Sequence, residues 1–383
     1  IRQLDFDVGH DNTLYFHVTL VPYLGTSEEY KTKPTQHSVA TLRSVGIQPD
    51  ALILRSTQVV PAGGRKKIAL FANVPVDAVF NSYDAPHVYA VPSILEGQGM
   101  GDFIERSFGL PSRTPDLSKW DAAVGILTEP ERTVNIAVVG KYIEMPDAYL
   151  SLAEALQHAG IANQTGVKIR WIDAELLTPE TVSDLAFYHG ILVPGGFGAR
   201  GIPGKLIATQ YAREHQVPFM GIGLGFQVAA IEFARNVLGL AGADSTEFTA
   251  EPEHPVVHLM PDQAYITMMN DTMRLGSWPM DLTPGTKLAA AYGAERVRER
   301  HRHRYELNHD YVAQLEQHGL RVAGTTPGKD GYGSGLIEAL ELQDHPFFVG
   351  LQSHPELRSR LLHPHPAITA FIHAALAHQG QRG

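Results

Sequence analysis

The stretch that decides the fold is Gly-Ile-Gly-Leu-Gly-Phe-Gln at residues 221–227, and a similar turn, Val-Pro-Gly-Gly-Phe-Gly, precedes it at 193–198. Each turn follows a short apolar run, at 190–193 and 217–220, that predicts a buried strand. After the second turn, apolar residues recur at helical spacing from 228 to 238. A strand, a sharp glycine-flanked turn and a helix together predict a nucleophile elbow, whose backbone N–H groups can bind an oxyanion.

The central position of this elbow holds Gly223, which has no side chain. An elbow of this kind presents a nucleophile, and the position should hold Ser or Cys. The chain has no cysteine, so disulfides, thiolate metal sites and thiol nucleophiles are excluded. A serine-type α/β hydrolase is excluded as well, because no Ser occupies the elbow. The turn also lacks the G-x-G-x-x-G spacing of a dinucleotide site.

Length and charge set broad limits on the class of protein. The chain has 383 residues, which suggests two or three domains, and a net charge of −10, which argues against a general nucleic-acid binder. No apolar run approaches the roughly 18 residues of a membrane span, so we expect a soluble cytoplasmic protein without membrane partners. The chain starts at Ile1 without Met, and its first residues read as the end of a helix, so we expect an N-terminal truncation.

The rhythm of strands and helices predicts two α/β domains. In residues 1–110, strands are expected at 13–21, 51–54 and 88–91, with helices at 39–45 and from Lys66-Lys67 onward. Residues 111–132 are rich in Pro and charged side chains and form the candidate linker. Residues 133–383 again alternate strands with helices, which predicts an open sheet. Sites in such sheets lie at the carboxyl ends of the strands, where both glycine turns and His354 are expected.

Two polar stretches each allow two interpretations. The first, Lys-Thr-Lys-Pro-Thr-Gln at residues 31–36, is most simply a solvated loop, but its cations and hydroxyls also suit a phosphate site. The second, Arg-His-Arg-His-Arg-Tyr-Glu at 300–306, is either a solvated loop or a binding loop for an anionic small molecule. Metal binding there is disfavoured, because arginines flank both histidines.

His354 and Glu356 suit a base and the carboxylate that orients it.

These motifs together resemble one family, cytidine triphosphate (CTP) synthase, over nearly the whole chain. The segments similar to its glutamine amidotransferase domain are 195–198, 221–227, 245–248, 272–276, 300–306 and 354–356. The segments similar to the second half of its synthase domain are 31–38, 44–50 and 67–71. The resemblance therefore implies a partial P-loop-type α/β amidoligase domain at 1–110, the linker, and a class I amidotransferase domain with an open, mostly parallel sheet at 133–383.

The resemblance implies a ligase of pyrimidine biosynthesis. One domain would hydrolyse L-glutamine, and the ammonia would aminate UTP to CTP in the other, with ATP and Mg²⁺ as cofactors and GTP as an allosteric activator. His354 would be the base and Glu356 its orienter, and a homotetramer is expected. The residues implied to bind glutamine are Gly196, Leu224, Gly225, Phe226, Gln227, Glu247 and Arg304. Those implied to bind nucleotides are Lys31, Thr32, Lys33, Pro34, Thr35, Gln36, Lys67, Tyr83, Asp84 and Ala85.

The chain departs from the family pattern in two important ways. Gly223 stands where the family has its cysteine nucleophile. The phosphate-binding loop and the acidic Mg²⁺ ligands are expected to precede Ile1, so no metal ligand is assigned in this chain. Smaller departures are Ser353 before His354 and Asp271 before Thr272. We therefore expect a catalytically deficient chain, and the alternative is a non-catalytic module that binds glutamine or nucleotides for regulation or assembly.

Overall fold

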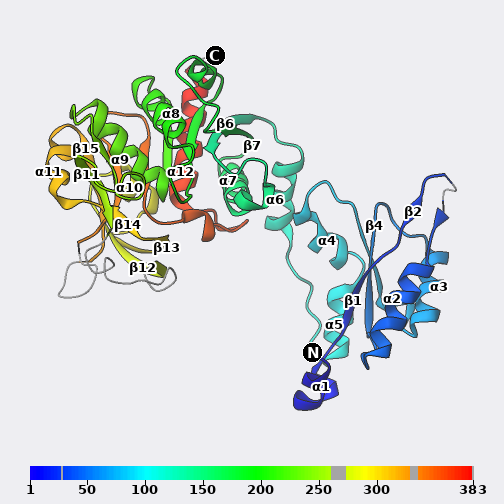
Figure 1. Cartoon of the computed structure of the whole chain (residues 1–383). Helices are drawn as coiled ribbons and strands as arrows, with labels where there is room; N and C mark the ends of the chain where they lie inside the picture. The colour runs from blue at the N-terminus through cyan, green and yellow to red at the C-terminus, as the bar shows by residue number, and fades with distance from the viewer. Residues whose placement is uncertain (27–28, 260–272, 328–334, 382–383) are drawn as a thin grey trace. The chain divides into compact units, whose positions relative to one another are not determined.

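The computed structural model describes residues 1–26, 29–259, 273–327 and 335–381 (Figure 1). The chain divides into two compact units, Ile1–Thr128 and Glu129–Gly383. The division falls inside the predicted linker, most of whose second half is helix α6 (Ser118–Thr128), so a linker role for 111–132 stays a prediction. Among the described residues, no helix is both long and apolar enough to cross a bilayer.

The first unit is built on a three-stranded parallel sheet in the order β1-β4-β5. Its strands are β1 (Phe16–Leu20), β4 (Ala51–Ser56) and β5 (Val79–Tyr83). Apolar side chains of α2 (Lys33–Ser44) and α3 (Ala62–Ala72) pack with those of β4 in one core. Side chains of α4 (Val91–Glu96) and α5 (Met100–Ser107) pack on the other face. Figure 1 shows these two helices on the opposite side of the strands from α2 and α3. The remaining elements are α1 (Arg2–Val8), β2 (Tyr23–Leu24) and β3 (Glu29–Tyr30).

Two expectations for this unit are wrong. Lys33 does not lie in a loop but opens helix α2, with Pro34 in the first turn. Proline suits that turn because its missing N–H needs no partner there. Residues 88–91 are not a strand: a 3-10 turn (Val88–Ala90) leads into α4, which has Pro92 in its first turn. Four apolar residues cannot distinguish a strand from the start of a helix by periodicity alone.

In the second unit, nine of the described strands form one sheet in the order β13-β12-β15-β16-β17-β9-β8-β6-β7. From β17 to β7 neighbouring strands are parallel, and from β13 to β17 they are antiparallel. The parallel half comprises β6 (Thr133–Gly140), β7 (Gly166–Asp173), β8 (Gly190–Val193), β9 (Phe219–Ile222) and β17 (Phe348–Leu351). The antiparallel half adds β12 (Arg274–Leu282), β13 (Arg296–His303), β15 (Leu320–Thr325) and β16 (Ile337–Leu342). The α/β class and the open sheet of an amidotransferase are confirmed.

Helices cover both faces of this sheet (Figure 1). One core contains side chains of α8 (Ile202–Glu214) and α9 (Leu224–Asn236). The core on the other face contains side chains of α7 (Leu150–Ala162), α10 (Lys287–Tyr292) and α12 (Pro366–Gly380). A small second sheet lies beside the first core, with the order β10 (Ala243–Ser245), β11 (His254–Leu259) and β14 (Tyr305–Leu307). Helix α11 (His309–Gln317) follows β14.

The basic run at 300–306 corrects a further expectation, because it is not a loop. Most of it lies in strand β13, and Tyr305 opens β14. Side chains alternate across a strand, so Arg300 and Arg302 are exposed while His301 and His303 are buried. The alternation of Arg with His is therefore a strand pattern of period two. It was hidden because both residue types are polar.

Candidate active site

The elbow is present, with Gly223 between the end of β9 and the start of α9. Its backbone has φ 56° and ψ −109°, a conformation in which glycine is strongly favoured over residues with a side chain. The Gly223 N–H donates a 2.7 Å hydrogen bond to the Leu351 carbonyl of β17. Close by, a β-carbon on Gly225 would lie 2.0 Å from the Val193 carbonyl oxygen. Glycine at 225 therefore lets α9 pack directly against β8.

His354 faces the side of Gly223 on which a side chain would stand. A β-carbon built on Gly223 would lie 3.5 Å from His354 Nε2 and 3.7 Å from Gly195 Cα. The other ring nitrogen, Nδ1, is 2.7 Å from Glu356 Oε1, and both side chains are largely buried. A proton on Nδ1 shared with the carboxylate leaves the Nε2 lone pair directed at position 223. This is the arrangement of a general base and its orienting acid.

A cavity of about 370 Å³ opens over the elbow and His354. It brings together residues from both glycine turns, from β13 and β14, and from the loop after β17. Its lining residues include Gly195, Gly196, Phe197, Gln227, Glu247, Arg302, His303, Arg304, Tyr305, His354 and Glu356. Six of the predicted site residues therefore lie together around one cavity: Gly196, Gln227, Glu247, Arg304, His354 and Glu356.

Glu247 and Arg304 place opposite charges in this cavity. Glu247 Oε1 accepts a 2.6 Å hydrogen bond from the Gly198 N–H. Burial raises the pKa of Glu247, and the hydrogen bond and the positive charges of Lys141, Arg304 and Lys205 oppose that rise. A carboxylate and a guanidinium that line one cavity match the ammonium and carboxylate of an α-amino acid.

The other three predicted glutamine residues at the start of α9 do not line the cavity. The side chains of Leu224 and Phe226 are buried in the core, and Gly225 packs against β8. Gln227 does line it, yet its Nε2 already donates to the Tyr305 carbonyl at 3.1 Å and to Gln352 Oε1 at 3.2 Å. Any contact of these residues with a ligand would be made by their backbone, so their assignment stays a prediction.

The structure adds lysines that the motifs did not indicate. Lys141 is buried at the end of β6, and its Nζ donates to the carbonyls of Phe197 and Gly198 in the first glycine turn. Burial lowers the pKa of Lys141, and Arg200 lowers it further. Lys141 follows an apolar strand, so the strand-end rule applied to the turns could have found it. Lys205 lies inside helix α8, where no sequence signal distinguishes it from a surface lysine.

Beneath the cavity lies a buried group of charged and polar side chains centred on Arg274. The Arg274 guanidinium contacts Glu306 Oε1 at 3.4 Å and is hydrogen-bonded to Glu338. Burial raises the pKa of Glu306 to about 8 and that of Glu338 to about 6. His301 Nδ1 is 3.0 Å from His303 Nε2, and burial lowers the pKa of both rings. His301 and His303 belong to strand β13, and Arg304 is the next residue. The buried group therefore supports Arg304 by anchoring that strand. Thr272 and Asp271 lie outside the described residues.

In the first unit, a groove of about 600 Å³ gathers part of the predicted nucleotide site. Its lining residues are Glu29, Tyr30, Lys31, Thr32, Lys33 and Lys67. The other predicted residues are not among them. Thr35 is buried and donates to the Leu20 carbonyl at 3.0 Å, and Gln36 donates to Thr32 Oγ1 at 3.2 Å.

Tyr83 ends β5, and Asp84 after it forms an exposed ion pair with Arg55. The predicted ATP contacts of Tyr83, Asp84 and Ala85 stay predictions, and so does the predicted nucleotide contact of Pro34.

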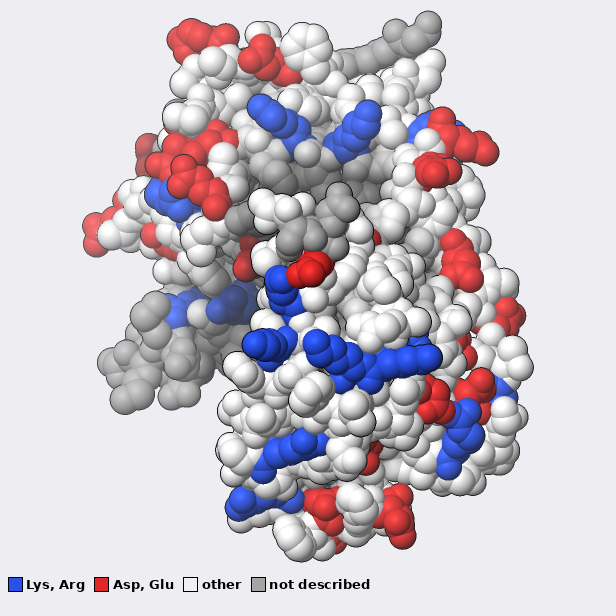
Figure 2. Space-filling view, turned by 90° about the vertical axis from the view of Figure 1, so that its right-hand side faces the viewer, with Lys and Arg blue, Asp and Glu red and all other residues white. Residues whose placement is uncertain are grey.

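On the face shown in Figure 2, Lys and Arg side chains stand in separate groups between uncharged and acidic residues, rather than in one continuous basic surface.

The residues present do not form the Mg²⁺ site that the resemblance implies. Within residues 1–26, 29–259, 273–327 and 335–381, no group of three or more His, Asp or Glu side chains is arranged to hold a metal ion.

An elbow at the end of a parallel strand, a His–Glu pair facing it and a cavity lined by a carboxylate and a guanidinium are typical of a class I glutamine amidotransferase. The comparisons agree: the model of the class I glutamine amidotransferase family matches residues 144–374, and that of the CTP synthase N-terminus matches residues 1–110. The chain belongs to the CTP synthase family, whose members are glutamine-hydrolysing ligases.

Three relatives illustrate this membership. CTP synthase of Thermus thermophilus is 59% identical over 381 residues, which cover 99% of this chain and 69% of the relative. CTP synthase of Deinococcus radiodurans is 54% identical over 388 residues, covering 100% of this chain and 71% of the relative. The solved glutaminase domain of the Trypanosoma brucei enzyme, with bound acivicin, is 38% identical with a TM-score of 0.59, and the match covers 64% of this chain and 94% of that one.

Proposed function

We propose that the second unit binds L-glutamine in the cavity over Gly223 and that the chain as written does not hydrolyse it. The observation that carries the proposal is the 3.5 Å between His354 Nε2 and the position of a β-carbon at 223. His354 and Glu356 have the geometry of a base and its orienting carboxylate beside the turn, and Gly223 has no side chain to act as the nucleophile. Without it no acyl-enzyme can form, so hydrolysis should stay at background.

The cavity suggests how each group would act on glutamine. Arg304 would pair with the α-carboxylate and Glu247 with the α-ammonium, which directs the carboxamide toward Gly196 and the elbow. In a chain with Cys at 223, His354 Nε2 would take the thiol proton and the thiolate would attack the carboxamide carbon. Backbone N–H groups of the two turns would hold the oxyanion, and His354 would return the proton to the departing ammonia. Water would then hydrolyse the thioester to glutamate.

The wider role follows from family membership. We propose that the first unit contributes Lys31, Lys33 and Lys67 to a site for the phosphates of UTP or CTP. ATP and Mg²⁺, activation by GTP, assembly into tetramers and a cytoplasmic location are carried over from the family in the same way. Amination of UTP is the reaction that the ammonia would serve.

The test is the variant Gly223→Cys, exposed to a glutamine-like electrophile and analysed by mass spectrometry. We expect a covalent adduct at residue 223 and measurable ammonia release from glutamine. Gly223→Ala is the matched control, because it imposes the same backbone strain of about 1–3 kcal/mol without supplying a thiol. A folded Gly223→Cys protein that binds glutamine but gives neither adduct nor ammonia would overturn the catalytic assignment of His354.

That outcome would favour the second candidate, a non-catalytic module that binds glutamine or nucleotide for regulation. The observation in its favour is that Glu247 and Arg304 line the cavity although position 223 has no nucleophile. Calorimetric titration of the unmodified chain with L-glutamine, with Arg304→Met as a comparison, measures this binding directly. If the unmodified chain binds no glutamine, the first candidate fails, and the second survives only as a module that binds nucleotide.

A further inference from the structure

A lysine that the proposed chemistry does not use lies beneath the first glycine turn. Lys205, in the first turn of α8, is completely buried, and its Nζ has no hydrogen-bond partner among the described residues. That nitrogen lies 3.8 Å from the point that a β-carbon on Gly196 would occupy. Lysine is almost never fully buried unless it is paired, because an isolated ammonium loses its hydration. Such a residue needs a reason to be there.

Three charged groups act on Lys205, and one of them, Glu247, lines the cavity over the elbow. Lys141, from the end of β6, and Arg200, from the turn before α8, are the positive charges that face it, and Glu247 is the negative one. Arg200 is in turn paired with Glu175. Burial lowers the pKa of Lys205 to about 7, and repulsion by Lys141 is the next largest cause. Lys205 also acts on Glu247, together with Lys141 and Arg304.

From this arrangement we infer that Lys205 is a positioning residue of the glutamine site: it supports the Gly196 turn from beneath and keeps the Glu247 carboxylate charged for the substrate's α-ammonium. The inference rests on the proposed function, since it assumes that glutamine binds between Glu247 and Arg304. It deepens that function by assigning a role to a side chain that touches no substrate.

The two protonation states of Lys205 suit this role at different pH. In acid, where Glu247 would take up a proton, Lys205 is charged and opposes that protonation. At pH 8 most Lys205 is neutral, so it does not repel the ammonium of the ligand. A lysine that only filled space would affect glutamine binding equally at every pH. The pH profile therefore separates the two roles.

The experiment measures the Kd of L-glutamine by calorimetry from pH 5 to pH 8.5 in the full chain, with and without Lys205→Met. Methionine has a similar length and replaces an unpaired buried amine by an apolar group, so the variant should fold. We expect an unchanged Kd at pH 8 and binding that is about three- to tenfold weaker at pH 5, because the pKa of Glu247 rises. Lys205→Arg, charged at every pH, should show the reverse, with its loss at pH 8.

Lys168→Met is the matched control, because Lys168 is an exposed lysine of β7 and should leave the profile unchanged. An equal loss at all pH values in Lys205→Met would overturn the inference and leave Lys205 a structural residue. If the unmodified chain binds no glutamine, the proposed function fails, and the charge on Glu247 is still measurable by carboxyl ¹³C NMR. A Glu247 pKa that is the same in Lys205→Met as in the unmodified chain would overturn the inference independently.

Discussion

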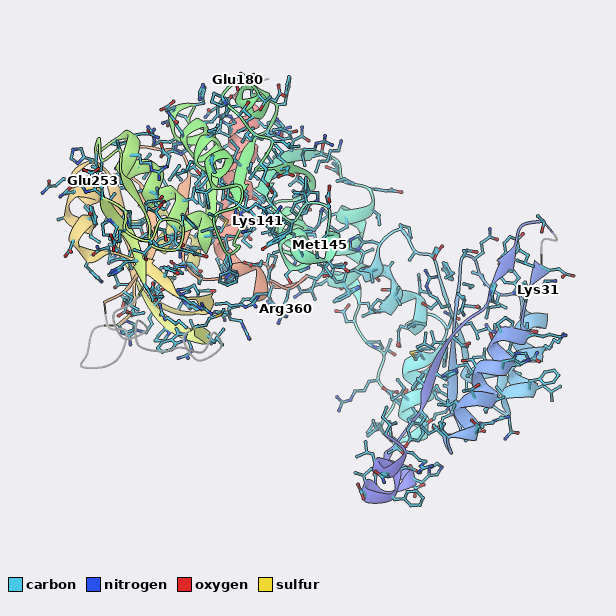
Figure 3. All side chains as sticks on the ribbon, viewed as in Figure 1. Lys31, Lys141, Met145, Glu180, Glu253 and Arg360 are labelled. Atoms are coloured by element: carbon cyan, nitrogen blue, oxygen red, sulfur yellow. The ribbon has the colours of Figure 1, made fainter. Side chains whose placement is uncertain are left out.

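The cavity of the second unit and the lysine groove of the first present charge in opposite ways. Lys141, labelled inside the second unit in Figure 3, is buried and hydrogen-bonded to the turn that it supports, whereas Lys31 stands at the surface of the first unit and pairs with exposed Glu29. Burial shifts the pKa of Glu247, which lines the cavity, and of Lys141 and Lys205, which act on Glu247. The groove gathers like charges without enclosing them.

This difference teaches where each site's specificity would come from. Electrostatic interactions in a desolvated site are strong and depend on geometry, so single changes in the cavity should have large effects. Interactions between exposed lysines and phosphates are screened by salt and add up from several weak contacts. The predictions below test this contrast, from the largest expected effect to the smallest.

The largest effect should follow loss of the base from the buried site. In the Gly223→Cys protein, His354→Ala should lower the rate of glutamine hydrolysis by roughly 10⁴-fold or more, because it removes the ring nitrogen that faces position 223. Ammonia release under saturating glutamine measures this. Glutamine affinity should change little, since the proposed partners of the α-amino and α-carboxylate groups are Glu247 and Arg304. A rate within tenfold of the parent would show that the His–Glu pair is not the base.

The next effect concerns the buried ion pairs below the cavity. Arg274→Met should destabilise the second unit by about 3–5 kcal/mol, because it leaves the Glu306 and Glu338 carboxyls buried without their cation. Arg55→Met, which breaks the exposed pair with Asp84 in the first unit, should cost about 0–1 kcal/mol. Hydrogen exchange followed by mass spectrometry reports each unit separately. Equal losses in the two variants would contradict the contrast between buried and exposed charge.

A third prediction concerns acid. His345 is buried, with Nε2 3.0 Å from the Ala212 carbonyl and Nδ1 accepting from the Phe347 N–H at 3.2 Å, so only the neutral ring satisfies both partners. Burial lowers its pKa from 6.5 to about 4. Between these values the unfolded chain binds more protons, so stability falls as the pH falls from 6.5 to 4.

The loss attributable to His345 should reach about 3 kcal/mol below pH 4. Urea unfolding of the unmodified chain and of His345→Gln at pH 7 and pH 4.5 measures it. The variant should be less stable at pH 7 but should lose less stability on acidification. Parallel pH dependence in the two proteins would show that His345 is not responsible.

The smallest effect is expected at the groove. Lys31→Ala combined with Lys33→Ala should weaken binding of UTP or CTP by about tenfold at low salt, and by less at high salt, because exposed charges are screened. Titration at two salt concentrations checks this, with Lys119→Ala as an exposed control in the same unit. An affinity that the double variant leaves unchanged at low salt would identify the segment as a solvated one.

Much of the cavity could be predicted from the sequence, because its parts follow strands directly. The elbow at Gly223 consists of consecutive residues, and His354 and Glu356 lie two positions apart after an apolar strand. Consecutive parallel strands end at one edge of a sheet, so their trailing residues meet. Local sequence and tertiary position coincide there.

The remaining parts could not be read because tertiary packing decides them. Lys205 is buried only because α8 packs under the turn, and nothing local separates it from a solvated lysine. His301 and His303 face inward because β13 pairs with β12. This pairing could not be predicted from residues 300–303 themselves, because they are all polar. Lys33 opens a helix because Pro34 suits the first turn, a signal that the charge of the segment obscured.

The turn at Gly223 is closed by its own N–H bond to Leu351 and by the packing of Gly225, and neither contact involves a side chain at 223. The shape of the turn therefore does not depend on which side chain stands at position 223. Glycine and cysteine codons differ by a single base, so hydrolysis could be lost or regained in one mutational step without refolding the site. Glycine at this left-handed position also removes the strain of about 1–3 kcal/mol that any other residue bears there. Selection for stability alone would therefore favour glycine at 223, and only selection for ammonia production would favour cysteine there.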